Sequence, residues 1–208
     1  IKMPRMVHAA YLRSPFAHAE IVSIDRTAAE AAPGVVGVFT GEDIAKVCTP
    51  WVGVLTHLQG LRSPEQYPMA MGRARWQGEA VVAVVAASRA QAEDAVELVN
   101  IEWKQLPAAT DMEAALDADA TVIHEEFGDN LCWERRIDEG DVDAAFANAA
   151  AVVEEDFRFH RHTGVTMEGR SLLASFDSGD DMLTVYQSTQ GPHMTQALYA
   201  KHFNLEEH

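Results

Sequence analysis

Seven consecutive apolar residues, Ala80–Ala86, set the strongest limit on how this chain can fold. A strand with one solvated face alternates apolar and polar residues, whereas an unbroken apolar run is typical of a strand buried on both faces. Ser88-Arg89-Ala90-Gln91 follows and matches a helix capping box. Apolar residues then recur at helical spacing: Ala92, Ala95, Val96 and Val99. The pattern predicts a fully buried strand followed by an amphipathic helix.

The rest of the chain predicts a mixture of short strands and short helices. Strands are expected at residues 7–13, 19–25, 35–39, 101–104, 151–159, 171–177 and 182–187. Short helices are expected after Thr27, Thr40, Thr110 and Gly140, the first three at capping-box patterns. Ser178-Gly179-Asp180-Asp181 is a hairpin signal, and residues 48–72 predict a long irregular loop. The fold class is therefore α+β.

Periodicity weakens and charge rises over residues 117–139. A domain boundary is predicted there, with one domain at 1–116 and a second at 117–208. The length of 208 residues fits either one large domain or two small ones.

Composition excludes several classes of partner and location. A formal net charge of −16 disfavours nucleic-acid binding, and no apolar run approaches the roughly 20 residues of a membrane span. The two cysteines, Cys48 and Cys132, form no C-x-x-C pair, which argues against an iron–sulfur cluster or zinc site, although a disulfide between them stays open. Sparse cysteine and no visible signal peptide predict a cytoplasmic protein.

Residues 182–203 contain the main candidate site. A predicted strand at 182–187 is interrupted by Ser188-Thr189-Gln190-Gly191-Pro192, and a helix is expected to begin at Pro192. Gly191 permits an unusual turn, and such a corner gathers free backbone N–H groups that attract an anion or an oxo group. Gln190 would lie at its tip with an amide that both donates and accepts. The alternative is an ordinary turn with a surface glutamine.

Three further groups of residues have plainer interpretations than a metal or catalytic site. His160 and His162 would share one face of a strand, but no third metal ligand is fixed, so surface histidines are favoured and no metal site is predicted. Glu168 and Arg170 fit a salt bridge better than catalysis. Cys132 has no neighbouring base that would activate it as a nucleophile.

Motifs in a fixed order resemble the large subunits of molybdenum hydroxylases, the xanthine dehydrogenase, aldehyde oxidase and carbon monoxide dehydrogenase family. The matching segments cover residues 6–19, 33–36, 40–43, 77–86, 92–95, 140–146, 167–170 and 188–193. The resemblance implies an α/β-hammerhead domain at 1–116, followed at 117–208 by the beginning of a molybdopterin-binding domain.

The same resemblance implies site roles. Gln190 would lie beside the molybdenum and hydrogen-bond its oxo ligand, and Met167-Glu168-Gly169-Arg170 would lie near the same centre. The family usually has proline where Thr166 and Gly169 stand, which puts the local backbone rigidity in doubt.

The family's glycine-rich cofactor loop and its distal glutamate base would lie beyond His208. The chain is therefore expected to be a fragment that has no complete catalytic set and is inactive alone.

The parent subunit would hydroxylate an aldehyde, an N-heterocycle or a related small molecule with oxygen derived from water. Molybdopterin would bind the full-length subunit, while [2Fe–2S] and FAD would be carried by partner subunits. The alternative from a different class is a non-catalytic structural or subunit-docking module.

Overall fold

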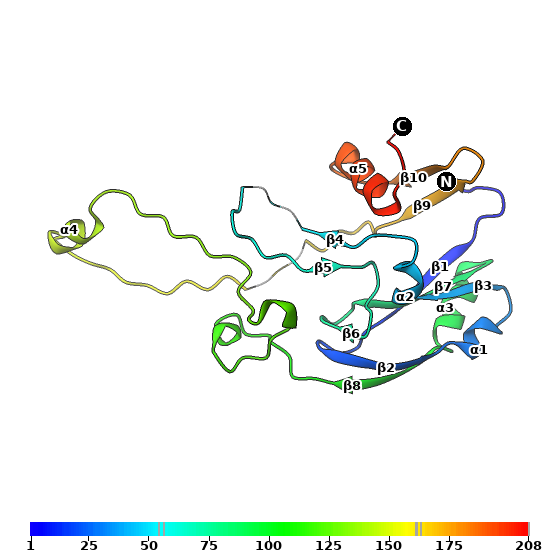
Figure 1. Ribbon diagram of the computed structural model, residues 1–208, viewed down its shortest axis with the longest axis horizontal. Helices are drawn as coiled ribbons and strands as arrows, with labels where there is room; N and C mark the ends of the chain where they lie inside the picture. The colour runs from blue at the N-terminus through cyan, green and yellow to red at the C-terminus, as the bar shows by residue number, and fades with distance from the viewer. Residues whose placement is uncertain (54, 56, 161, 163, 208) are drawn as a thin grey trace.

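The computed structural model describes residues 1–53, 55, 57–160, 162 and 164–207. Figure 1 shows a body built from small antiparallel sheets, with a β-hairpin and a helix at one end of it. A long arm that carries one short helix extends away from this body (Figure 1).

The described residues form short elements in the following order. The strands are β1 (His8–Arg13), β2 (Ala19–Asp25), β3 (Val35–Thr40), β4 (Trp51–Val52), β5 (Glu65–Gln66), β6 (Arg73–Ala74), β7 (Ala80–Ala86), β8 (Asn100–Gln105), β9 (Leu172–Asp177) and β10 (Met182–Gln187). The α-helices are α1 (Thr27–Glu30), α2 (Gly41–Ile44), α3 (Arg89–Val96), α4 (Val142–Ala147) and α5 (Pro192–Phe203). Two 3-10 turns, η1 (Ala114–Leu116) and η2 (Glu125–Phe127), lie between β8 and α4.

The apolar run forms β7, the central strand of a three-stranded antiparallel sheet in the order β1-β7-β3. Helix α3 packs on β1 and β7, and Ala92, Ala95 and Val96 of its apolar face are buried. Val81, Val82 and Val84 are fully buried. The predictions of a buried strand and an amphipathic helix are therefore confirmed. The strand is apolar throughout because it is paired on both edges and covered by a helix, which leaves no solvated position for a polar side chain.

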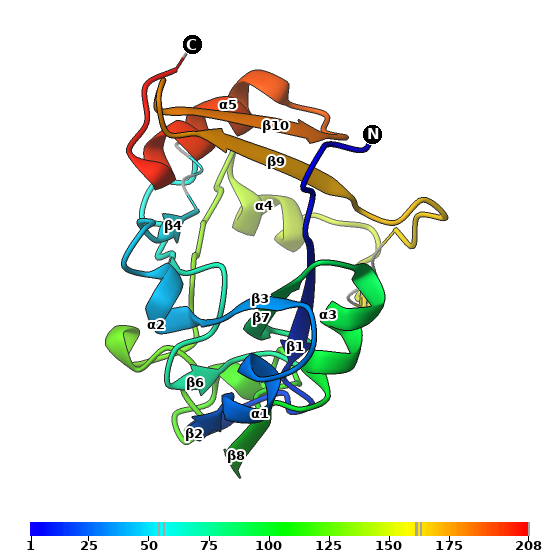
Figure 2. The ribbon, with the colours of Figure 1, turned by 90° about the vertical axis from the view of Figure 1, so that its right-hand side faces the viewer.

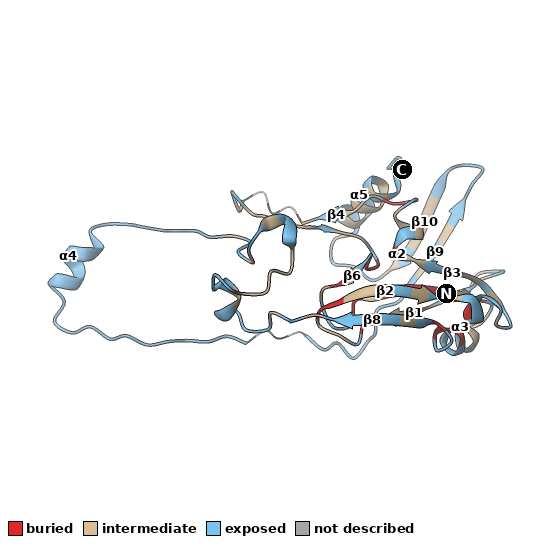
Figure 3. Cartoon of the chain, turned by 60° about the horizontal axis from the view of Figure 1, so that its bottom comes forward, coloured by how far each residue is buried: buried red, intermediate tan, exposed pale blue. Residues whose placement is uncertain are grey.

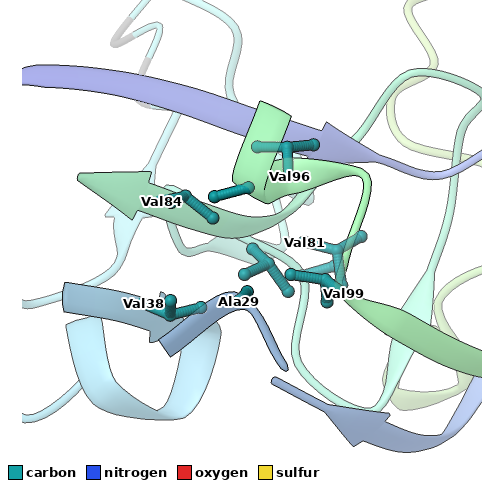
Figure 4. Close-up of a cluster of buried hydrophobic side chains, with 9 residues drawn as sticks. Ala29, Val38, Val81, Val84, Val96 and Val99 are labelled. Atoms are coloured by element: carbon teal, nitrogen blue, oxygen red, sulfur yellow. The ribbon is translucent and has the colours of Figure 1, made fainter. Parts of the chain in front are cut away.

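One hydrophobic core joins the sheet to its helices (Figure 4). Its buried members are Ala29, Val38, Ala70, Val81, Val82, Val84, Ala95, Val96 and Val99. Partly buried residues of β2 and β8, including Ile21 and Trp103, pack against it from the second sheet, β6-β2-β8. The core therefore lies entirely within residues 1–107.

Of the four predicted capping boxes, two are confirmed and two are corrected. Ser88 accepts the Gln91 N–H at 3.3 Å and caps α3, and the Asp43 carboxylate accepts the Thr40 N–H at 3.2 Å. Thr27 is the first helical residue of α1 and caps nothing, because Asp25 accepts its N–H at 3.0 Å. After Thr110 the cap is Asp111, and only a 3-10 turn follows.

The predicted strand at residues 151–159 is absent. These residues have no regular secondary structure and lie exposed on the arm (Figure 3). Alternation favours a strand only when a neighbouring strand is available to pair, and none of the described residues supplies one here. The helix expected after Gly140 does form as α4, with the Asp141 carboxylate accepting the Ala144 N–H at 2.9 Å.

Arg62 holds the segment between η1 and the arm against the body. Its guanidinium donates to the Asp129 carboxylate and to the carbonyls of Phe127 and Leu131, and its backbone N–H donates to the Cys132 carbonyl at 2.8 Å. The Arg62 guanidinium also holds the pKa of Asp129 below its usual range. The arm therefore leaves the body from a fixed point.

Glu79 is a buried residue directly before β7, and its carboxyl group allows a test of how stability depends on pH. The side chain is 7% exposed and accepts the Arg75 N–H at 2.6 Å. Burial raises the pKa of Glu79, although the hydrogen bond from Arg75 opposes the shift. A raised folded pKa stabilises the fold most below the unfolded pKa, and that contribution is lost as pH rises through the folded value.

Glu79→Gln is expected to gain stability relative to the natural chain as pH rises from 4 to 7, because only the carboxyl must then bury a charge. The change should be on the order of 1 kcal/mol. Urea unfolding across this range measures it, with the exposed Glu97→Gln as control. A stability difference that does not vary with pH would contradict the prediction.

Candidate site at the β10–α5 corner

The corner between β10 and α5 has the predicted architecture. Residues 188–191 join the end of β10 at Gln187 to α5, whose first residue is Pro192. The Tyr199 hydroxyl donates to Gln187 Oε1 at 2.7 Å, which ties the helix to the end of the strand. In Figure 2 helix α5 lies next to the β9–β10 hairpin.

Two threonines fix the backbone of the corner. The Gly191 N–H donates to Thr189 Oγ1 at 3.2 Å, and Thr195 Oγ1 donates to the Gly191 carbonyl at 2.9 Å. The two hydroxyl oxygens are 3.2 Å apart. Gly191 has φ −133° and ψ 73°, a conformation that is neither helical nor extended and lies outside the left-handed region. The two hydroxyl bridges hold this turn.

Gln190 lies exposed at this corner, and its side chain makes no hydrogen bond within the described residues. No side chain caps α5, whose first residue, Pro192, carries no N–H. An amide donor thus stands beside an uncapped helix N-terminus, a donor set suited to an anionic or oxo group. These donors are chemically compatible with the oxo group of a molybdenum cofactor, which the family resemblance implies for this corner.

Two hollows border the corner. One, of about 410 Å³, lies between β10 and α5 and is lined by residues that include Thr189, Thr195 and Tyr199. The other is an open groove of about 1400 Å³ between β1 and α3 on one side and the β9–β10 hairpin on the other. Ser188 lines that groove. Gln190 therefore lies directly after residues that border both hollows.

The hairpin brings the two predicted site motifs together. In the antiparallel register Leu172 pairs with Gln187, so the chain before Leu172 and the chain after Gln187 emerge at the same end. Arg170 and Ser188 both line the open groove. Met167 and Glu168 are exposed on the arm, and the salt bridge expected between Glu168 and Arg170 is not observed.

Other candidates are not assembled into sites. His160 and His162 are exposed, and the strand that would have placed their rings on one face is absent. Across the described residues no group of three His, Cys, Asp or Glu side chains could hold a metal. Both cysteines are free: Cys48 is buried and Cys132 exposed. No helix among the described residues is long and apolar enough to cross a membrane.

One contact at the far end of α5 was not foreseen from sequence. The Thr49 N–H donates to the His202 carbonyl at 2.9 Å, and His202 Nδ1 lies 3.1 Å from the Thr49 carbonyl. The contact joins residues 153 positions apart. The sequence could not predict this contact, because neither residue lies in a recognisable motif and local patterns do not show which distant segments meet.

Two protein-family models match the chain. Residues 1–107 match the a/b hammerhead domain of aldehyde oxidase and xanthine dehydrogenase, and residues 123–208 match the molybdopterin cofactor-binding domain. The chain belongs to the aldehyde oxidase and xanthine dehydrogenase family. The hammerhead domain contains the core described above, and the corner lies within the molybdopterin cofactor-binding domain.

Curated relatives and solved structures agree with this family assignment. The nicotine 6-hydroxylase large subunit of Paenarthrobacter nicotinovorans is 36% identical over 100% of this chain and 25% of its own length. The carbon monoxide dehydrogenase large chain of Afipia carboxidovorans is 31% identical over 100% of this chain and 27% of its own. Quinoline 2-oxidoreductase from Pseudomonas putida 86 superposes with a TM-score of 0.93 and 36% identity, over 100% of this chain and 26% of that one. The chain thus spans about a quarter of the length of the relatives it matches.

Proposed function

We propose that this chain is part of the molybdenum-binding large subunit of a hydroxylase that inserts water-derived oxygen into a carbon–hydrogen bond. The proposal is supported by the Gln190 amide, which has no hydrogen-bond partner among the described residues and lies beside the uncapped start of α5. Both lie inside the segment that matches the molybdopterin cofactor-binding domain. We also place the domain boundary between residues 116 and 117, where η1 ends at Leu116.

In the proposed reaction a substrate C–H and one water give C–OH, two protons and two electrons. The molybdenum cofactor, when bound, would accept the two electrons and release them one at a time. Gln190 would donate a hydrogen bond from its amide to the cofactor, and the threonine bridges would hold that amide in place. A pre-positioned donor stabilises developing negative charge because it need not reorganise during the reaction.

The substrate is proposed to be an aromatic N-heterocycle, with an aldehyde as the second choice. Both 36% identical relatives carry the name of an N-heterocyclic compound, nicotine or quinoline, whereas the aldehyde oxidoreductase of Desulfovibrio gigas is 26% identical. The proposed partners are separate [2Fe–2S] and FAD subunits. Relatives described as a large chain or as subunit gamma of a complex support that arrangement, and a cytoplasmic location is proposed with it.

Isotope labelling of the full-length complex tests the proposal. Turnover of an N-heterocycle in H₂¹⁸O should place ¹⁸O in the product, and the purified complex should contain molybdenum. Label that comes from ¹⁸O₂ instead would contradict the proposed oxygen source. A complex without molybdenum, prepared in a host that loads other molybdenum enzymes, would favour the non-catalytic docking module.

A further inference from the structure

The corner before α5 contains a closed ring of hydrogen bonds around Gly191. The Gly191 N–H donates to Thr189 Oγ1 at 3.2 Å, and Thr195 Oγ1 donates to the Gly191 carbonyl at 2.9 Å. The two hydroxyl oxygens lie 3.2 Å apart and form a third hydrogen bond, whose direction the distance alone leaves open. Both polar backbone groups of Gly191 are therefore joined to each other through two side chains.

The supply of protons sets the direction of every bond in this ring. A threonine hydroxyl has one proton and two lone pairs. Thr195 gives its proton to the Gly191 carbonyl, so Thr195 Oγ1 must accept from Thr189. Thr189 is able to donate because its oxygen only accepts the Gly191 N–H. All bonds then run in one sense around the ring, an arrangement in which each bond polarises the next.

Three polar side chains on one face of α5 tie the helix to the rest of the chain, and no residue of the helix is fully buried. Thr195 belongs to the ring, the Tyr199 hydroxyl donates to Gln187 Oε1 at 2.7 Å, and His202 Nδ1 lies 3.1 Å from the Thr49 carbonyl. Residues spaced by three or four positions are neighbours on a helix surface. The position of α5 thus depends on polar ties, and Thr195 supplies the tie at the corner.

The ring encloses the backbone on both sides of Gln190. The bond from the Gly191 N–H to Thr189 Oγ1 spans Gln190 and closes a turn of the kind that threonine hydroxyls favour. The Gln190 side chain is exposed and makes no hydrogen bond of its own within the described residues. The placement of its amide therefore depends on the backbone that the two threonines hold.

We propose that Thr195 is a positioning residue for the proposed reaction. Through the ring it fixes the backbone beside Gln190 and so holds the glutamine amide where it can donate to a bound cofactor. This role rests on the proposed function, because it requires Gln190 to act at the cofactor. The position requires a hydroxyl and not merely a side chain of this size, since the ring closes only through the oxygen of Thr195.

Thr195→Val in the full-length complex removes the hydroxyl and keeps the shape of the side chain. We expect kcat to fall by about three- to tenfold with KM and molybdenum content unchanged, because a misaligned donor stabilises the transition state less. Thr195→Ser restores a hydroxyl and is expected to recover most of the lost kcat. Thr110→Val, at an exposed position outside both matched domains, is the control and should keep the natural kcat. A natural kcat in Thr195→Val, or an equal loss in Thr195→Ser, would overturn the proposal.

The double variant Thr195→Val with Gln190→Ala separates positioning from a general effect on the fold. If Thr195 acts through Gln190, the double variant has the kcat of Gln190→Ala alone, whereas two independent effects multiply. Multiplied losses would overturn the positioning role of Thr195.

Hydrogen exchange of the full-length complex tests the ring without turnover. The Gly191 amide is expected to exchange about tenfold faster in Thr195→Val than in the natural protein, and the serine variant should restore its protection. Unchanged exchange in Thr195→Val would overturn the ring. A natural kcat in Gln190→Ala would instead overturn the action of Gln190 at the cofactor while the change in exchange persists, so the two failures are distinguishable.

Discussion

Gln190→Ala in the full-length subunit is expected to lower kcat by about ten- to a hundredfold while molybdenum content stays unchanged. The range corresponds to the loss of one hydrogen bond to a charged group, about 1.5–3 kcal/mol. Gln190 is exposed and unpaired within the described residues, so its truncation removes no contact that this part of the fold needs. Steady-state kinetics with metal content measured on the same preparation gives the result.

Gln105→Ala is the matched control, because Gln105 is also exposed but lies at the end of β8 in the hammerhead domain. The control should keep the natural kcat and the natural molybdenum content. A Gln190→Ala enzyme with natural kcat at equal loading would remove Gln190 from the site. A variant that loses its molybdenum would show that Gln190 retains the cofactor rather than assisting turnover.

Val84→Ala is expected to lower the free energy of unfolding of the 208-residue chain by about 2–3 kcal/mol, and Val84→Asp to prevent folding. Val84 is fully buried on β7, the strand that pairs with both neighbours in its sheet. Removing two methyl groups leaves a cavity, while aspartate would bury a charge with no partner. Urea unfolding followed by circular dichroism measures the first change, and recovery of soluble protein the second.

The control for this core test is Val36→Ala on β3, where the side chain is 67% exposed. Its unfolding free energy should change by less than about 0.5 kcal/mol. If Val36→Ala and Val84→Ala lower the free energy of unfolding by the same amount, burial on β7 would not be the source of the stability of the hammerhead domain.

Much of the body could be predicted from sequence because its signals are local. The apolar run of β7, the Ser88 cap of α3 and the turn between β9 and β10 each depend on residues within a few positions of one another. Interactions between residues that are close in sequence are sufficient to form such elements, and the structure confirms all three. The cap at Thr27 failed because Asp25, two residues earlier, competes for the same backbone N–H.

The predicted strand at residues 151–159 failed for a different reason. Its alternation is clear in the sequence, but a strand requires a neighbour, and no local pattern reveals whether one is present. At the candidate site, sequence located the corner and Gln190, whereas the threonine bridges across Gly191 depend on how the chain folds back. The approach of Arg170 to the same groove depends on the register of the hairpin.

The Thr49–His202 contact has a mechanical consequence for the corner. Helix α5 has 12 residues, so it is a rod of about 18 Å. Thr49 holds one end of this rod, and the opposite end carries the backbone on which Gln190 is mounted. A displacement of the segment around Thr49 would therefore move helix α5 as a rigid unit. The Gln190 amide would then change its position although no residue next to it had been altered.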